Sequence, residues 1–241
     1  MKIIDINTVY GPYTGATAGN GSAELEQRLE EGGAEKAVTL CSYGIYYSYR
    51  DGNARTLKAC SDSQRLLPAA TVDPRGFFGQ KELLPKLKEA GFRLLRFFPD
   101  LQEWDAEHLV FEELLSLNAQ VRLPVMISVT GPGQITRVFR AASRLDYPVI
   151  LQGVDHLHLA EAISAVRQSA AFMVETSGLS MPATLELLHG SVGADRILFG
   201  SGACERSVSI ARDFVLAAHI PDGDKEKIFY TNSASLLGVN S

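Results

Sequence analysis

Short apolar runs alternate with longer segments of helical periodicity along the whole chain. The runs are rich in β-branched residues and end in polar or Gly residues, as the buried strands of a parallel sheet do. Several of the helical segments close with Gly or Asn, which favour a helix C-terminus. This alternation predicts repeated βα units. The predicted strands span residues 3–9, 37–41, 67–72, 94–98, 124–129, 148–153, 172–176 and 196–200.

Repeated βα units without a low-complexity linker predict one α/β domain over residues 1–241, a closed (β/α)8 barrel of the TIM type. The alternative is an open doubly wound sheet. Against it, no GxGxxG follows the first strand, and the GATAGNG segment at 15–21 lacks the dinucleotide fingerprint. The final segment, 224–238, reads as a helix that closes the barrel and is broken near Asn232, which would cap its last part.

Composition narrows the function classes. The chain is 46% hydrophobic and 21% charged, so it can bury a large core, and its net charge is -5 without a Lys/Arg cluster. These values argue against nucleic-acid and anionic-membrane partners, and they favour a small-molecule ligand. No apolar run is long enough to span a bilayer and the N-terminus lacks signal-peptide features, so we expect a cytoplasmic protein. An odd number of cysteines without CxxC spacing predicts reduced thiols.

In a (β/α)8 barrel, chemistry lies at the C-terminal ends of the strands and in the loops that follow. Polar side chains at strand ends also cap helices or bond neighbouring strands, so each candidate has that structural alternative. The strand-end rule selects Asp5, Asn7, Cys41, Tyr43, Asp73, Arg96, Ser128, Gln152, Asp155, the 175–177 segment including Ser177, and the 201–206 segment.

Two ionisable groups follow apolar runs. Glu175 ends the FMVE segment, where desolvation would suit it to general acid–base catalysis near neutral pH. Its alternative role is a salt bridge to a nearby Lys or Arg. Arg96 lies between apolar residues and could hold a substrate carboxylate by two-point contact. Its alternative role is an internal ion pair with Glu175 or Asp73.

Two loops add candidates. Cys204 lies in the glycine-bearing GSGACERS loop, close to a predicted helix start that would favour a thiolate nucleophile. The alternative is a small residue packed inward, because no His lies near it in sequence. This loop and TSGLS at 176–180 could instead form an anion pocket. The tyrosine-rich 41–53 segment, which includes Tyr43, could line a pocket for an aromatic or sugar-like ligand, or form a contact in a homo-oligomer.

Five segments carry a family resemblance, in order and at suitable spacing: VDPR at 72–75, AGFRLLRFFPD at 90–100, LPVMISVTG at 123–131, ADRILFGSG at 194–202 and IFYTNSASLLG at 228–238. On these segments the chain resembles the amidohydrolase superfamily, in the amidohydrolase-2 branch of small barrels. The resemblance extends over nearly the whole length. It implies a (β/α)8 barrel and, in most members, a divalent metal that activates water.

The resemblance fails at the metal ligands. Family members usually carry DxHxH at the first strand, a His after the fifth, a His after the sixth and an Asp after the eighth. This sequence has Asn7 and Val9 in place of the first two histidines, then Ser128, Gln152 and Gly202. Neutral amides and hydroxyls are poor substitutes for imidazole and carboxylate ligands. We therefore expect no metal cofactor.

A remodelled metal site is the remaining metal hypothesis. It would draw on Asp5, Asp155, His156 or Glu175, which a barrel could bring together at its mouth. The DHLH run at 155–158 is the nearest cluster of metal-ligating residue types. Its alternative is structural, with Asp155 capping the helix that follows.

The sequence thus predicts a metal-independent hydrolase or decarboxylase that acts on a small carboxylate-bearing molecule. In this hypothesis Arg96, Glu175 and Cys204 are the catalytic candidates, and the substrate-binding candidates are Asp5, Asn7, Tyr43, Asp73, Ser128, Gln152 and Ser177. The alternative is a non-catalytic homologue that binds a small molecule or a protein partner, because all the usual ligands are lost together.

Overall fold

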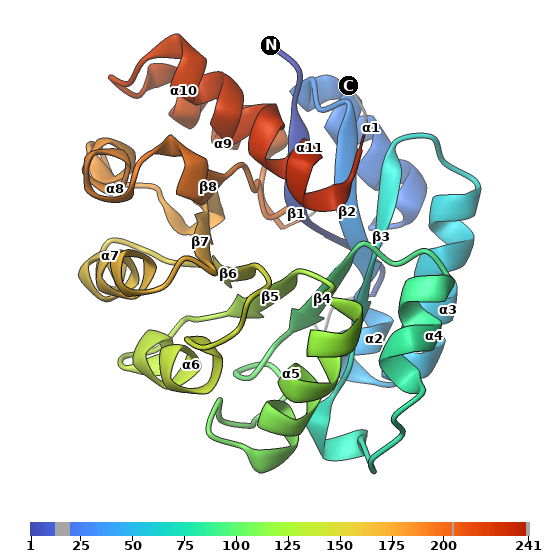
Figure 1. Cartoon of the computed structure of the whole chain (residues 1–241). Helices are drawn as coiled ribbons and strands as arrows, with labels where there is room; N and C mark the ends of the chain where they lie inside the picture. The colour runs from blue at the N-terminus through green and yellow to red at the C-terminus, as the bar shows by residue number, and fades with distance from the viewer. Residues whose placement is uncertain (13–19, 204, 240–241) are drawn as a thin grey trace.

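The computed structural model describes residues 1–12, 20–203 and 205–239. Within these residues, an eight-stranded parallel sheet runs in the order β1 to β8 and curves into a barrel (Figure 1). The predicted (β/α)8 fold is confirmed. The predicted loop at 15–21 lies largely outside the described residues. The strands are β1 Ile4–Tyr10, β2 Lys36–Cys41, β3 Leu66–Thr71, β4 Leu94–Phe97, β5 Val125–Ser128, β6 Val149–Gln152, β7 Phe172–Glu175 and β8 Ile197–Leu198.

The barrel closes through the segment that follows β8. The Ile6 amide donates to the Phe199 carbonyl at 2.9 Å, and the Gly202 amide donates to the Asn7 carbonyl at 3.0 Å. Thr8 and Ala203 form a parallel bridge at the same edge. Closure therefore places the loop after β8 directly beside the C-terminal half of β1.

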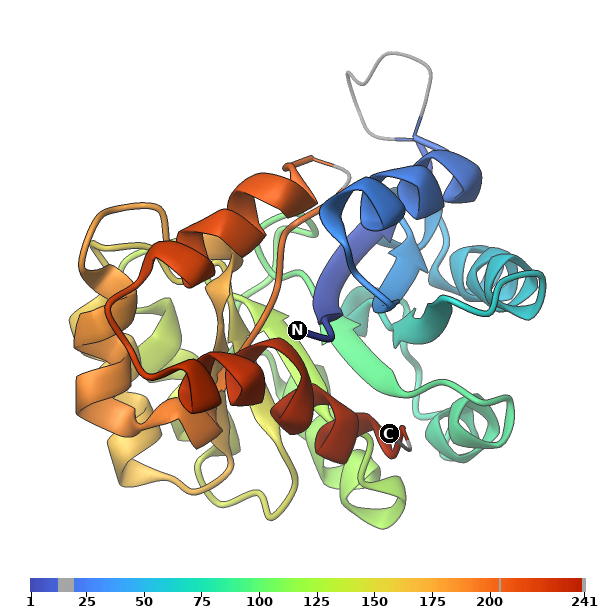
Figure 2. The same ribbon diagram turned by 90° about the horizontal axis from the view of Figure 1, so that it is seen from above.

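Helices surround the barrel (Figure 2). In the described part of the chain, none of them is both long and apolar enough to cross a membrane. The α-helices are α1 Ser22–Gly32, α2 Tyr43–Tyr46, α3 Tyr49–Ser61, α4 Leu83–Glu89, α5 Leu109–Val121, α6 Gln134–Ala142, α7 Leu159–Gln168, α8 Thr184–Val192, α9 Val208–Ala217, α10 Asp222–Glu226 and α11 Asn232–Leu237. Short 3₁₀ turns are η1 Pro74–Gly76, η2 Thr176–Gly178 and η3 Ala194–Arg196, and η4 Lys227–Thr231 is a π-helical turn.

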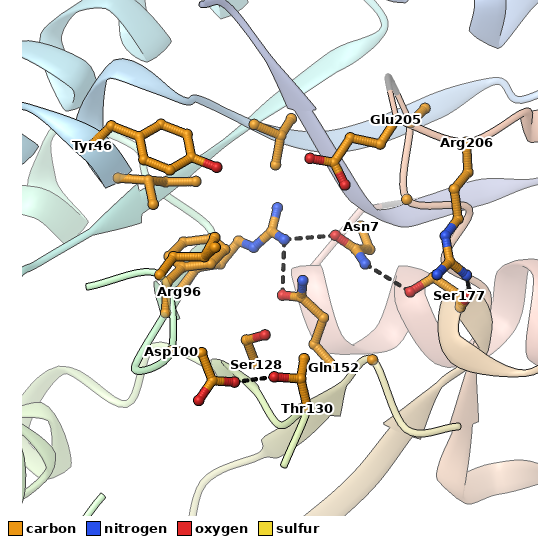
Figure 3. Close-up of a pocket in the computed structure, with 17 residues that line it drawn as sticks. Asn7, Tyr46, Arg96, Asp100, Ser128, Thr130, Gln152, Ser177, Glu205 and Arg206 are labelled. Atoms are coloured by element: carbon orange, nitrogen blue, oxygen red, sulfur yellow. Dashed lines mark hydrogen bonds between the residues drawn. The ribbon is translucent and has the colours of Figure 1, made fainter. Parts of the chain in front are cut away.

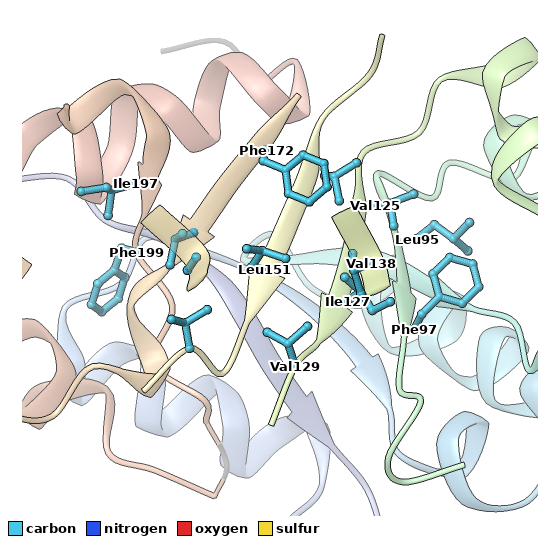
Figure 4. Packing of buried hydrophobic residues seen from close by; sticks show 14 of the residues in the cluster. Leu95, Phe97, Val125, Ile127, Val129, Val138, Leu151, Phe172, Ile197 and Phe199 are labelled. Atoms are coloured by element: carbon cyan, nitrogen blue, oxygen red, sulfur yellow. The ribbon is translucent and has the colours of Figure 1, made fainter. Parts of the chain in front are cut away.

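Alternation along the strands divides the core into two clusters. Side chains between the sheet and the helices form the outer cluster, and Figure 4 shows Leu95, Phe97 and Ile127 in it. Leu94 and Phe98 belong to the cluster inside the barrel. Because successive strand residues face opposite sides, Arg96 takes the inward direction of Leu94 and Phe98. The same alternation places polar side chains at the inner C-terminal ends of β5 and β6.

The C-terminal segment is helical from α10 through η4 to α11. Ala234 and Leu237 pack against the cluster inside the barrel, so α11 covers one end of it. The expectation for Asn232 was wrong, since α11 has no side-chain cap. The side-chain nitrogen of Asn232, Nδ2, instead donates to the carbonyls of Ala194 and Ile197, each at 2.8 Å, which ties the helix to the start of β8.

Candidate active site

A cavity of about 280 Å³ opens at the C-terminal ends of the strands (Figure 3). Strand ends supply its inner polar wall, and helix α2 and the loops after β4, β5 and β8 supply its rim. Apolar side chains form another part of the wall. The polar lining residues at the strand ends are Asn7, Arg96, Ser128, Gln152 and Ser177, those at the rim are Tyr46, Asp100, Thr130, Glu205 and Arg206, and the apolar ones are Val9, Ile45, Phe98, Leu101 and Ala203.

Arg96 is the central polar group of this cavity. Its side chain is fully buried, and three neutral oxygens accept hydrogen bonds from the guanidinium. Nη1 donates to the Thr8 carbonyl at 2.8 Å, while Nη2 donates to Asn7 Oδ1 at 2.6 Å and to Gln152 Oε1 at 2.9 Å. The face of the Phe98 ring lies 5.1 Å from the guanidinium carbon. These hydrogen bonds fix the orientation of the guanidinium in the cavity wall.

A one-way chain of hydrogen bonds connects this cation to a buried carboxylate. Arg96 donates to Asn7, Asn7 Nδ2 donates to Ser177 Oγ at 3.1 Å, and Ser177 Oγ donates to Glu175 Oε1 at 2.7 Å. The first two links are drawn in Figure 3. Every donor points from the cation toward the anion, and aligned hydrogen bonds of this kind polarise one another.

Glu175 lies beneath the cavity and does not line it. Its side chain is fully buried. Besides Ser177 Oγ, its carboxylate accepts hydrogen bonds from the Gly153 amide at 2.9 Å and the Ser177 amide at 2.8 Å. A Cβ at Gly200 would lie 2.1 Å from Glu175 Oε2, so only glycine at position 200 leaves room for this carboxylate. Glu175 therefore reaches the cavity through the Ser177 hydroxyl.

Asp5 is the second carboxylate beneath the site. It is fully buried and accepts hydrogen bonds from the Ser201 amide at 3.0 Å, the Asn7 amide at 3.1 Å and the Ser201 hydroxyl. Burial raises the pKa of Asp5 to about 7; the Ser201 and Asn7 hydrogen bonds oppose this rise, and the negative charge of Glu175 adds to it. Asp5 thus fastens the loop after β8 to β1 rather than facing a ligand.

The rim carries charges of both signs. Asp100 accepts hydrogen bonds from Thr130 Oγ1 and Gln134 Nε2, and Arg206 donates to the Ser177 carbonyl (Figure 3). Burial raises the pKa of Tyr46, and the nearby Glu205 carboxylate raises it further. The phenol therefore stays protonated at neutral pH and can donate a hydrogen bond to a ligand.

Several predicted site residues meet in this cavity and others do not. Tyr43 lies outside the lining, where its ring stacks on Tyr47 with centroids 4.9 Å apart and carries the Arg55 guanidinium 4.1 Å above it. Asp73 also lies outside, since it caps η1 and pairs with Arg75 at 2.9 Å. The lining does include Asn7, Arg96, Ser128, Gln152 and Ser177. Cys204 lies outside the described residues.

The geometry of two other predicted segments differs from the expectation. The tyrosine-rich 41–53 segment, expected to be a loop, folds as α2 and the start of α3, and from it Tyr46 reaches the cavity. Asp155 does not cap α7 as expected, because α7 has no side-chain cap. Its carboxylate instead accepts from the amides of Leu157 and His158 and bonds His158 Nδ1 at 2.7 Å. Asx-type bonding of this kind fixes the turn before α7.

Sequence reasoning missed Asp100 and Thr130. They come from the loops after β4 and β5 and meet across the rim. Both follow a predicted strand end within a few residues, so a wider window around each strand end would have included them. Arg206 falls within the predicted 201–206 segment, and its position in the sequence indicates no specific role.

Comparison with known proteins gives this barrel a family. A model for amidohydrolases, Amidohydro_2, matches residues 47–239, most of the sequence. The chain belongs to the amidohydrolase family. A comparison with curated proteins found no match.

Solved structures share the fold of this amidohydrolase-family chain at low sequence identity. A 5-carboxyvanillate decarboxylase from Sphingomonas paucimobilis aligns with a TM-score of 0.80 and 12% identity, covering 99% of each chain. An uncharacterised TIM-barrel protein, Bb4693 from Bordetella bronchiseptica, gives 0.78 and 16%, also over 99% of each chain. A dihydroxybenzoic acid decarboxylase from Polaromonas sp. JS666, solved with manganese and 2-nitroresorcinol, gives 0.76 and 15%, covering 100% of this chain and 98% of the other.

The described side chains at this cavity do not suit a divalent metal. Asn7 Oδ1 and Gln152 Oε1, the amide oxygens at two positions where the resemblance implies metal ligands, both accept from Arg96 Nη2. A divalent ion on these oxygens would lie about 5 Å from the guanidinium, and at an effective dielectric constant of about 20 the two cations would repel by roughly 7 kcal/mol. Among the described residues, no group of three or more His, Cys, Asp or Glu side chains could hold a metal ion.

Proposed function

We propose that this amidohydrolase-family barrel is a metal-independent enzyme that acts on a small carboxylate-bearing molecule, by decarboxylation or by hydrolysis. The observation that carries the proposal is the Arg96 guanidinium, fixed in the wall of the cavity by Asn7, Gln152 and the Thr8 carbonyl. A fixed guanidinium binds a carboxylate or a phenolate oxygen without first having to be ordered.

Decarboxylation is the reaction that we place first. The solved neighbours named decarboxylases support it, and a cavity of about 280 Å³ with polar and apolar walls suits one substituted ring. Phe98 and Ile45 would contact the apolar face of such a ring, while Ser128 and the Tyr46 phenol would form hydrogen bonds with its oxygens. Aromatic carboxylates therefore serve as the first probes.

Arg96 assists decarboxylation only if it contacts the oxygen on which negative charge accumulates. The ring carbon that bears the carboxylate is protonated first, which makes it tetrahedral and turns the adjacent oxygen into a carbonyl. When CO₂ then leaves, the electron pair of the broken C–C bond restores the aromatic ring and negative charge moves onto that oxygen. A guanidinium on that oxygen stabilises the transition state, whereas one on the leaving carboxylate alone would stabilise the ground state. We therefore expect a substrate with a hydroxyl beside its carboxylate.

The proton that replaces CO₂ would come from Ser177, supplied by Glu175. In the structure Ser177 Oγ donates to Glu175 Oε1 and accepts from Asn7 Nδ2. With Glu175 protonated, the bond to Glu175 would reverse, so that Ser177 accepts from Glu175 and directs its own proton to the ring carbon. Glu175 is left as a carboxylate, with the Gly153 and Ser177 amides bonded to it. In hydrolysis the same pair would work in the opposite direction, with Glu175 accepting the proton of an attacking water through Ser177.

The test uses 2,6-dihydroxybenzoate and 5-carboxyvanillate, the substrates named for the solved neighbours. Each is incubated with the full chain in the presence of a chelator, and product formation is followed by liquid chromatography. Arg96→Lys keeps the positive charge but loses the planar guanidinium that can contact two oxygens at once. Glu175→Gln removes the group that carries the proton. Each variant should lower kcat by at least about tenfold. Arg75→Met is the matched control, since Arg75 pairs with Asp73 outside the cavity.

A second candidate is a non-catalytic binding protein. It is favoured by the burial of Asp5 and Glu175 beneath the cavity, which leaves no acidic side chain at its inner wall among the described residues. Calorimetric binding of either probe that depends on Arg96, without turnover by the native chain, would establish this candidate. Turnover that survives Glu175→Gln undiminished would remove the proton route that we propose.

A further inference from the structure

A second hollow lies beside the cavity, between η2 and helix α9. Its volume is about 330 Å³. Leu179, Ile210, Ala211 and Phe214 supply the apolar part of its wall. Ile210 is 73% exposed, although α9 packs its other side against the barrel core through Val208 and Val215. The hollow therefore presents apolar surface to solvent at the mouth of the barrel.

The wall between the two hollows is a pair of side chains. Ser177 and Arg206 line both of them. The stem of Arg206 lies over Gly202, where an added Cβ would be 3.3 Å from Arg206 Cδ, and its guanidinium donates to the Ser177 carbonyl. Arg206 is exposed and has a long, flexible side chain, so it can move aside and join the two hollows without any change in the backbone.

We propose that the two hollows form one binding site for an amphipathic carboxylate. The carboxylate lies at Arg96 in the first hollow, and an apolar tail passes beside Ser177 and the Arg206 stem to contact Ile210 and Phe214 in the second. This inference rests on the proposed function, because it assumes that Arg96 binds the anionic group. It adds that the substrate class extends beyond a single ring to molecules with an apolar tail.

The arrangement of charge supports this orientation. Arg96 is fully buried at the inner end of the first hollow, whereas Arg206 is exposed and its guanidinium bonds a backbone carbonyl. The second hollow holds no carboxylate among its described lining residues, and its polar members are hydroxyl groups and Arg206. An apolar tail therefore enters it without burying an unpaired charge.

The experiment measures the binding of unbranched alkanoates, from butanoate to decanoate, to the full chain by titration calorimetry. Each methylene that enters the second hollow should tighten binding about threefold to fourfold, from an apolar transfer of about 0.8 kcal/mol. Ile210→Asp places a charge in the hollow and should abolish this gain, so that decanoate binds this variant no more tightly than butanoate does. Leu216→Asp, on the same helix but outside the lining, is the matched control and should preserve the gain.

Ala211→Phe is a second variant, which fills the hollow instead of charging it, and should cap the gain at shorter chains. A gain with chain length that is equal in the native chain, Ile210→Asp and Ala211→Phe would overturn the inference, as would no gain at all in the native chain. Arg96→Met separates this failure from that of the proposed function. If butanoate binds Arg96→Met as tightly as it binds the native chain, Arg96 does not bind the carboxylate and the proposed function itself fails.

Discussion

The buried carboxylate of Asp5 makes stability depend on pH in an unusual direction. Burial raises the pKa of Asp5 from its ordinary value of 3.8 to about 7 in the folded chain. Between these two values the folded state binds more protons than the unfolded state, so the free energy of unfolding falls as pH rises. Stability from this group is complete below about pH 4 and is lost as pH approaches 7.

The size of the effect follows from the same two values. A rise from 3.8 to about 7, at 1.36 kcal/mol for each pH unit, corresponds to a loss on the order of 4 kcal/mol. Asn imitates the protonated acid, because its Oδ1 can keep the bonds from the Asn7 and Ser201 amides while its Nδ2 donates to Ser201 Oγ. We therefore expect Asp5→Asn to match the native chain within about 1 kcal/mol at pH 4 and to exceed it by several kcal/mol at pH 8.

Urea unfolding from pH 4 to pH 8 measures this difference. Trp104 is a suitable fluorescence probe, since it is the single tryptophan, is 8% exposed and packs against Phe97 and Phe111. Subtracting the native curve from the Asp5→Asn curve removes the contributions of the titrating groups that do not interact with Asp5. The assignment fails if that difference stays constant with pH.

Ser201→Ala gives a further check on the cause. The Ser201 hydroxyl lowers the pKa of Asp5, so its removal should raise the pKa further and enlarge the loss of stability toward high pH. The double variant Asp5→Asn/Ser201→Ala should show no such pH dependence. A Ser201→Ala curve parallel to the native one would contradict the role given to this hydrogen bond.

Two other results follow from the geometry. Gly200→Ala should lower the free energy of unfolding by about 1–3 kcal/mol, because the added Cβ would meet Glu175 Oε2 at 2.1 Å. Gly190→Ala has open space around the added Cβ and should raise the free energy of unfolding by about 0.5–1 kcal/mol. Urea unfolding measures both variants, and equal effects would refute the reasoning. Millimolar Mn²⁺ should leave Tm unchanged, since the inner acceptors already bind Arg96, and a rise of several degrees that EDTA reverses would reveal a metal site.

Much of the fold was predictable because it depends on a regular pattern. Buried parallel strands are nearly continuous apolar runs, and their repetition with helices specifies a barrel almost without reference to individual residues. The inward direction of Arg96, Ser128 and Gln152 also follows from alternation along β4, β5 and β6. The tyrosine-rich segment was misread, because its Gly and Ser residues resemble a loop while Gly44 and Gly52 in fact let α2 and α3 approach closely.

The depth of each strand-end side chain was not predictable from the sequence. Asp5 and Glu175 end beneath the cavity because the loop after β8 crosses them and supplies Ser201 and Gly200, residues about 25 to 200 positions away. Asp73 turns outward because Arg75, two residues on, offers a local partner. Distant backbone closure and local pairing decide these positions, and neither leaves a periodic signal.

The one-way chain of hydrogen bonds from Arg96 to Glu175 also constrains how such a barrel could evolve a different chemistry by amino-acid substitution. Asn7 uses its oxygen toward Arg96 and its nitrogen toward Ser177, so a carboxylate at this position would lose the bond to Ser177. A histidine at this position could accept from Arg96 and donate to Ser177 only if its two ring nitrogens lay where the amide oxygen and nitrogen of Asn7 lie now, which the geometry of the imidazole ring does not allow without a shift of the ring. Any single step toward a metal ligand here leaves buried partners unsatisfied, and the route between the two kinds of site requires several replacements at once.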